Sequence, residues 1–135
     1  DSFCVHDPDY ILHGIFILIG ITRYIHIGGA AHQGGENEIW NFNRKFLRLF
    51  LILFGKQILV AKHLEGEVLK SSDLDWTLVR PPRIANAPAS GNISIDEKNL
   101  KNLKVSVEDL TDFILLQITS KEWIRKAPLI SSEKI

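Results

Sequence analysis

The sequence predicts an α/β domain, because segments of helical and of strand character alternate along it. Residues 56–71 carry apolar side chains at helical spacing. Residues 74–79, LDWTLV, are rich in β-branched and aromatic side chains and are too short for a typical helix, which indicates a strand. Residues 23–27, RYIHI, are also predicted to form a strand. A long helix is therefore expected between two short strands.

The helix predicted at 56–71 has one apolar side. Val60, Leu64 and Val68 recur at every fourth position, with Ala61 and Leu69 beside them, and so lie together on the helix surface. This pattern is typical of an amphipathic helix, which is expected to end near Ser71 or Ser72.

Both predicted strands end in residues that change the course of the chain. Pro81 and Pro82 lack a backbone N–H and hold φ near −65°, so the chain must leave the sheet there. In an open α/β sheet, the carboxyl ends of the strands are where ligands bind. Gly28, Gly29 and Ala30 end the other strand, and such small residues let a backbone or a flat ligand ring approach closely. This corner is either a surface against which a cofactor binds or a simple turn, and the sequence leaves both interpretations open.

The remaining elements are predicted from local signals. Residues 46–54 are apolar on nearly every side, which implies burial against a partner surface or a segment outside this chain. Ser106 and Asp109 have the spacing of a capping box at the start of a helix. The other expected segments are a helix at 8–18, loops at 32–45 and 83–91, a solvated stretch at 96–104, and strands at 92–95 and 129–131.

Composition excludes several classes of function. The 135 residues suit one domain, and 16 basic residues balance 16 acidic ones, so no long-range attraction to nucleic acid or to an anionic membrane is expected. Cys4 is the only cysteine, which fits a reducing compartment such as the cytoplasm. Two apolar runs, 11–21 and 46–61, are too short or too interrupted by charge to span a bilayer. The five histidines lack metal-ligand spacing, so no metal site is expected.

Three segments resemble one family. Residues 67–82, EVLKSSDLDWTLVRPP, resemble the segment before and through the sixth strand of atypical short-chain dehydrogenase/reductase proteins. Residues 21–30, ITRYIHIGGA, resemble the fifth strand, and residues 105–113, VSVEDLTDF, the helix after the C-terminal loop. The group resembled is the NAD(P)H-binding one similar to flavin reductase/biliverdin reductase B and to NmrA-like proteins. The similarity spans residues 8–132 in the family's order.

The resemblance implies a Rossmann-like parallel sheet flanked by helices, and an incomplete one. The glycine-rich G-x-G-x-x-G motif that binds a pyrophosphate is absent from this sequence. In the family it lies on the first strand, which would precede Asp1. Residues 1–135 are therefore expected to form a single domain that corresponds to the C-terminal half to two-thirds of the family's domain. The implied cofactor is NADP or NAD.

The resemblance also implies the site residues. In the family, the chain just after the sixth strand passes beside the nicotinamide, and Arg83 is placed to meet a phosphate or an acidic substrate. The implied cofactor contacts are Gly28, Gly29, Ala30, Pro81, Pro82 and Arg83. Arg80 is interpreted either as part of this cluster or as a packing residue paired with Asp75 or Glu67.

The catalytic apparatus of many superfamily members is missing. They use a Tyr-x-x-x-Lys pair, in which the lysine lowers the tyrosine pKa. If Lys62 is that lysine, Ile58 stands at the tyrosine position. His63 matches a histidine of reductase-like relatives and is a candidate proton donor, although a plain surface histidine is the alternative. Lys62 and His63 are thus the candidate catalytic residues.

Two functions follow from the resemblance. The first is hydride transfer from NAD(P)H to a small carbonyl, quinone or flavin-like acceptor, with the protein supplying position and shape. The second is a non-catalytic, NmrA-like module that senses nucleotide or binds protein. The missing proton donor favours the second, and the reductase-like relatives favour the first. Homo-oligomers through an open edge of the 23–27 strand are also expected, unless residues 3–5 cover that edge.

Overall fold

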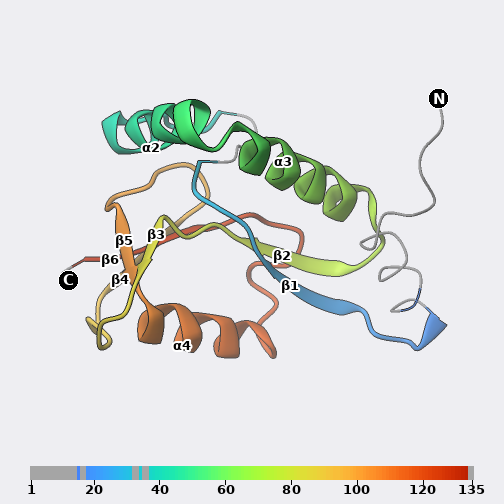
Figure 1. Ribbon diagram of the computed structural model, residues 1–135. Coiled ribbons are helices and arrows are strands. Elements are labelled where there is room, and N and C mark those ends of the chain that lie inside the picture. Colours follow the sequence, from blue (N-terminus) through green and yellow to red (C-terminus); the bar gives the residue numbers. More distant parts are fainter. Residues whose placement is uncertain (1–14, 16–17, 32–33, 35–36, 134–135) are drawn as a thin grey trace, which may run out of the picture.

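The computed structural model describes residues 15, 18–31, 34 and 37–133. The helix expected at 8–18 and the edge-covering piece at 3–5 lie largely or wholly outside these residues. The elements in chain order are β1 (Arg23–Ile27), α2 (Phe42–Phe54), α3 (Lys56–Ser71), β2 (Asp75–Val79), β3 (Arg83–Ala85), β4 (Ile93–Asp96), β5 (Lys104–Ser106), α4 (Val107–Gln117) and β6 (Leu129–Ser132) (Figure 1).

β1 and β2 pair in parallel. The register runs from Arg23 opposite Asp75 to Ile27 opposite Val79. On the other side of β2, the N–H of Arg80 donates to the carbonyl of Pro128 at 2.8 Å, so the chain leading into β6 lies beside β2. β6 pairs antiparallel with β4, and β3 pairs parallel with β5. The predicted strand, helix and parallel strand are confirmed.

Helices cover both faces of this sheet. Figure 1 shows α2 and α3 on one side and α4 on the other. On the α4 side, Leu110 and Phe113 are buried against core residues of the strands. On the α3 side, Leu69 packs with Trp76 and Leu78. The layered arrangement is the Rossmann-like α/β architecture that the resemblance implied.

The side of α3 that faces the sheet agrees with the prediction only in part. Leu69, expected on the apolar side, is buried together with Gly66, whereas Val60 and Leu64 are more than half exposed. Helical periodicity shows which side chains share a face, but only the position of the sheet decides which face is covered. The apolar side read from the sequence therefore lies largely in solvent in this structure.

Two further boundaries were predicted wrongly. The expected loop at 32–45 ends early, because the side chain of Asn41 accepts a hydrogen bond from the N–H of Arg44 and starts α2 at Phe42. The expected loop at 83–91 begins with the short strand β3, which pairs with β5. The stretch at 96–104, expected to be solvated, contains Leu100 in the core.

One edge of the sheet is unpaired in the described part of the chain. No strand among those residues pairs with β1 on the side away from β2. Unpaired N–H and C=O groups favour association with another strand. Self-association through β1 stays a prediction. No described helix is both long and apolar enough to cross a bilayer.

Candidate cofactor-binding site

The two strand ends singled out in the sequence lie side by side. The N–H of Gly28 donates to the carbonyl of Val79 at 2.8 Å, and the N–H of Ala30 donates to the carbonyl of Pro81 at 2.9 Å. Because β1 and β2 are parallel, both corners lie at the carboxyl edge of the sheet. The predicted adjacency of the Gly-Gly and Pro-Pro corners is confirmed.

The two glycines of the first corner meet different surroundings. A Cβ atom on Gly28 would come within 2.9 Å of Leu78 Cδ1, so the Leu78 side chain would have to shift to admit it. A Cβ atom on Gly29 would meet no atom within 4 Å among the described residues. Open space in front of a bare backbone is what a flat ring needs in order to lie against it. Gly29 is therefore the residue of this corner best placed to face a ligand.

The other expected contacts differ in accessibility. Ala30 is buried, its N–H donates to the carbonyl of Pro81, and its carbonyl accepts from Arg44 Nε. Ala30 therefore fixes the shape of the corner. Pro81 is buried and Pro82 is half-buried. Arg83 is exposed at the start of β3. Gly29, Pro82 and Arg83 are thus the accessible members of the set.

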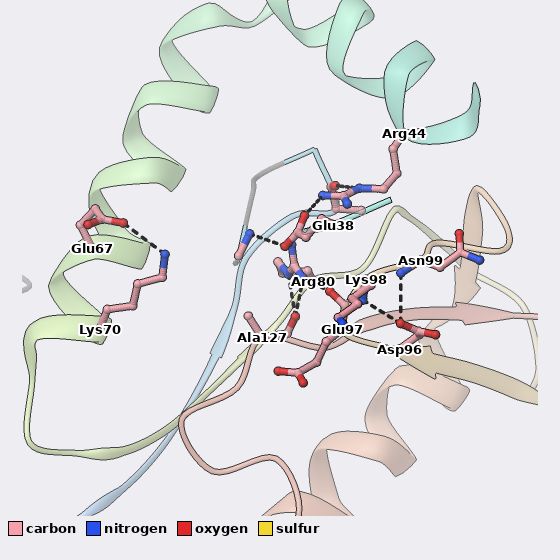
Figure 2. Close-up of polar contacts among 12 residues, drawn as sticks. Glu38, Arg44, Glu67, Lys70, Arg80, Asp96, Glu97, Lys98, Asn99 and Ala127 are labelled. Carbon is pink, nitrogen blue, oxygen red and sulfur yellow. Dashed lines mark hydrogen bonds and ion pairs between the residues drawn. The ribbon is translucent and has the colours of Figure 1, made fainter. Parts of the chain in front are cut away.

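A group of buried, charged side chains supports both the Gly-Gly and the Pro-Pro corner. Glu38 bridges two arginines: its Oε1 lies 2.8 Å from Arg80 Nη1 and its Oε2 lies 2.6 Å from Arg44 Nη2 (Figure 2). All three side chains are 2% exposed or less. Arg80 Nε also donates to the carbonyl of Ala127 at 2.8 Å, and Nη2 donates to that of Glu97 at 2.9 Å. The Glu38, Arg44 and Arg80 side chains are called the charge cluster below.

The partner of Arg80 was predicted wrongly, although its packing role was one of the two interpretations. Arg80 pairs with Glu38 and not with Asp75 or Glu67, because its side chain extends toward the loop before α2. Glu67 instead pairs with Lys70 on the surface of α3. Sequence reasoning missed Glu38 and Arg44 as well. They belong to a polar segment where local patterns indicate only a loop.

Electrostatics keep the cluster charged. Burial lowers the pKa of Arg80, and the negative charge of Glu38 opposes this effect. Burial alone would raise the pKa of Glu38, but the positive charges of Arg80 and Arg44 and the hydrogen bonds that Glu38 accepts outweigh it. The pKa of Glu38 therefore lies below its usual value, and the carboxylate stays ionised at neutral pH.

Gly34 is needed where the chain passes the charge cluster. Its N–H donates to Glu38 Oε1 at 2.7 Å, and an added Cβ atom would come within 2.6 Å of Arg80 Cζ and 2.8 Å of Ala127 Cβ. We expect Gly34→Ala to destabilise the fold by about 2 kcal/mol, because the buried arginine must shift. Gly29→Ala is the matched control, with an expected change of less than about 0.5 kcal/mol. Urea unfolding of both variants checks this, and equal losses would contradict it.

A second polar group joins β1 to α3. His26 Nε2 lies 2.9 Å from Glu65 Oε2, and Lys62 Nζ donates to the same oxygen at 2.8 Å. The hydroxyl of Tyr24 lies 3.4 Å from His26 Nδ1. Burial would raise the pKa of Glu65, but the hydrogen bonds and charges of Lys62 and His26 outweigh it and lower this pKa.

Of the two candidate catalytic residues, Lys62 belongs to this polar group and the exposed His63 follows it on the helix. The spacing of Lys62 and Glu65 on a helix is a visible signal for their pairing. Nothing local connects either of them with His26, which precedes Glu65 by 39 residues. No group of three or more His, Cys, Asp or Glu side chains in the described residues is arranged to hold a metal ion.

Comparisons with known proteins agree with this architecture. A family model described as NAD(P)H-binding matches residues 18–121. Among curated proteins, YhfK of Bacillus subtilis, described as an uncharacterized sugar epimerase, is 27% identical over 110 residues, which are 82% of this chain and 45% of that protein.

Solved structures of low sequence identity share the fold. A short-chain dehydrogenase/reductase from Veillonella parvula in complex with NADP superposes with a TM-score of 0.72 at 15% identity, covering 93% of this chain and 58% of that one. ChuY from Escherichia coli O157:H7, described as an anaerobillin reductase, superposes with a TM-score of 0.72 at 18% identity, covering 99% of this chain and 63% of that one. The chain thus spans about half to two-thirds of the length of these proteins.

Proposed function

Because the chain belongs to the NAD(P)H-binding family, whose model matches residues 18–121, we propose that it supplies the nicotinamide side of an oxidoreductase domain. The domain would transfer hydride from NADPH or NADH to a small carbonyl, quinone or flavin-like acceptor. The observation that carries this proposal is the adjacency of the Gly28–Gly29 and Pro81–Pro82 corners at the carboxyl edge of parallel strands.

The proposed roles follow from accessibility. Gly29 offers an open backbone surface to a flat ring, and Pro82 forms the adjacent wall. The exposed guanidinium of Arg83 is suited to a phosphate or to an acidic acceptor. The nicotinamide supplies the hydride when bound, while these residues hold it in position and limit access of water. The charge cluster holds both corners in place without touching the ligand.

A proton donor for the acceptor is proposed on α3. If Lys62 is the lysine of the Tyr-x-x-x-Lys pair, Ile58 stands where many superfamily members carry tyrosine. Lys62 has its ammonium group held by Glu65, which keeps a positive charge near the helix surface. His63 is exposed, and an imidazole ring can both donate and accept a proton, so it is the candidate proton donor. The reductase described for ChuY supports this assignment by similarity of fold only.

The experiment is a binding titration of the full-length protein with NADPH and NADH, followed by nicotinamide fluorescence. We expect saturable binding of one or both. Gly29→Leu should weaken it about tenfold or more, because the added side chain fills the space in front of the backbone. Leu116→Ala, on the exposed side of α4, is the control and should bind normally. Absence of binding by the unmodified protein would contradict the proposal.

The second candidate function is a nucleotide-sensing module without turnover. Isoleucine at position 58 and the engagement of Lys62 by Glu65 favour it. Saturable NADPH binding without oxidation of NADPH by a panel of quinones, flavins and small carbonyls would support sensing. Oxidation that falls in His63→Gln, with NADPH affinity unchanged, would support catalysis.

A further inference from the structure

Helix α2 has two faces, and the apolar one points away from the protein. Arg44 is buried, and Leu47 and Leu51 are half-buried on the side toward the body. The opposite side carries apolar residues that are all more than half exposed: Phe42, Phe46, Leu49, Phe50, Leu53 and Phe54. These six side chains are called the α2 apolar face. Figure 1 shows α2 at the edge of the molecule, on the side opposite α4.

The α2 apolar face is large for a protein surface. Its four phenylalanines are between 52% and 81% exposed, which corresponds to roughly 500 Å² of apolar area for rings of this size. Phe42 stacks on Phe46, and Phe50 contacts Phe54; because the four residues recur at every fourth position, the two pairs lie in one row along the helix. Continuous apolar patches of this size mark sites that bind a protein or a membrane.

The exposed charges on α2 and at the start of α3 have one sign. From residue 39 to residue 64 the sequence contains five basic and no acidic residues; two of the five, Arg44 and Lys62, pair with Glu38 and Glu65. The whole chain is neutral, so this stretch is a local basic segment within a balanced protein. Lys45, Arg48 and Lys56 are exposed. Helix geometry places Lys45 and Arg48 along one flank of the apolar face.

We propose that α2 lies in the surface of a bilayer containing anionic lipid, with its phenylalanine row among the acyl chains near the headgroups. A helix with aromatic and aliphatic residues on one face and lysine and arginine beside it has the composition of an interfacial membrane anchor. The inference does not depend on the proposed cofactor chemistry. It differs from a membrane span, which no described helix is suited to form.

Charge favours a bilayer over a second copy of this chain. Two α2 helices packed face to face would bring Lys45 and Arg48 of each copy close to those of the other, and α2 carries no acidic residue to pair with them. Like charges at an interface destabilise it. Anionic headgroups neutralise these same side chains and so attract the helix to the bilayer surface.

The test is co-sedimentation of the purified protein with vesicles of pure phosphatidylcholine and of phosphatidylcholine with phosphatidylserine. We expect binding to the anionic vesicles that weakens as salt is raised. Phe46→Asp should reduce the partition coefficient about tenfold or more. Leu116→Asp is the matched control, since it places the same charge at an exposed leucine of α4, and it should leave binding unchanged.

A second variant separates charge from folding. Lys45→Glu alters an exposed side chain, so the fold should persist, and binding to anionic vesicles should fall roughly tenfold. Equal binding to neutral and anionic vesicles, or no binding to either, would overturn the proposal. A dimer in sedimentation equilibrium that Phe46→Asp dissociates would also overturn it, because the face would then belong to a second copy.

Discussion

Glu38→Gln is expected to destabilise the protein by about 3–5 kcal/mol, the typical cost of breaking a buried ion pair from one side. Glutamine keeps the shape of the side chain but removes its charge. Arg44 and Arg80 would then stay buried within reach of one another without the carboxylate that lies between them. A loss of this size is a large part of the stability of a typical domain. Urea or thermal unfolding measures it.

The chain offers a matched control for this substitution. Glu67→Gln removes the same charge from a pair with Lys70 whose side chains are exposed on α3, at a separation of 3.2 Å (Figure 2). An exposed pair of this kind contributes between 0 and about 1 kcal/mol. We therefore expect Glu67→Gln to unfold almost like the unmodified protein. Similar losses in the two variants would mean that the charge cluster is not buried as the structure has it.

The charge cluster also has a consequence for the proposed site. Arg44 Nε donates to the carbonyl of Ala30, and Arg80 follows β2 directly before Pro81. Loosening the cluster should therefore disturb both corners together. At temperatures where Glu38→Gln is still folded, its NADPH affinity is expected to fall while Glu67→Gln binds normally.

Local signals in the sequence account for the elements that were predicted correctly. The strands at 23–27 and 74–79 and the end of α3 depend on side-chain type over a few residues. Ser106 caps α4 as its spacing predicted, with its Oγ accepting from the N–H of Asp109 at 2.9 Å. Pro81 and Pro82 stop β2 because they lack a donor.

The features that were missed depend on contacts between distant parts of the chain. Glu38 and Arg80 are 42 residues apart, and no periodicity links a loop glutamate to an arginine at the end of a strand. β3 exists only because β5 pairs with it, and three residues of ordinary composition give no signal alone. Whether Val60 faces the core or solvent depends on where the sheet lies, which periodicity leaves open.

A second buried carboxylate, Asp109, is expected to govern stability in acid. It is 4% exposed at the start of α4, and its Oδ2 accepts hydrogen bonds from the hydroxyl of Ser90 at 2.7 Å and from that of Ser132. It thereby joins α4 to the loop before β4 and to the last residue of β6. Burial would raise its pKa, but the hydrogen bonds from Ser132 and Ser90 outweigh this and lower the pKa to about 2.

Because this pKa is lower in the folded state than in the unfolded chain, the ionised carboxylate stabilises the fold above pH 4. That contribution, about 2 kcal/mol, should be lost as the pH falls from 4 toward 2. Asp109→Ala, which also leaves the serine donors without their acceptor, should cost about 3 kcal/mol at pH 7. Asp112→Asn, on the exposed side of the same helix, should cost less than about 0.5 kcal/mol.

Asp109→Asn isolates the effect of pH from the effect of lost contacts. The difference in unfolding free energy between this variant and the unmodified protein should be largest at pH 5 to 7. It should shrink as the pH is lowered toward 2, because Asp109 of the unmodified protein then becomes protonated. Other buried carboxylates, Glu38 among them, titrate equally in both proteins and so cancel in this difference. Urea unfolding at pH 6, 4, 3 and 2.5 supplies the measurement. A difference that stays constant with pH would show that the charge of Asp109 is not what holds these three elements together.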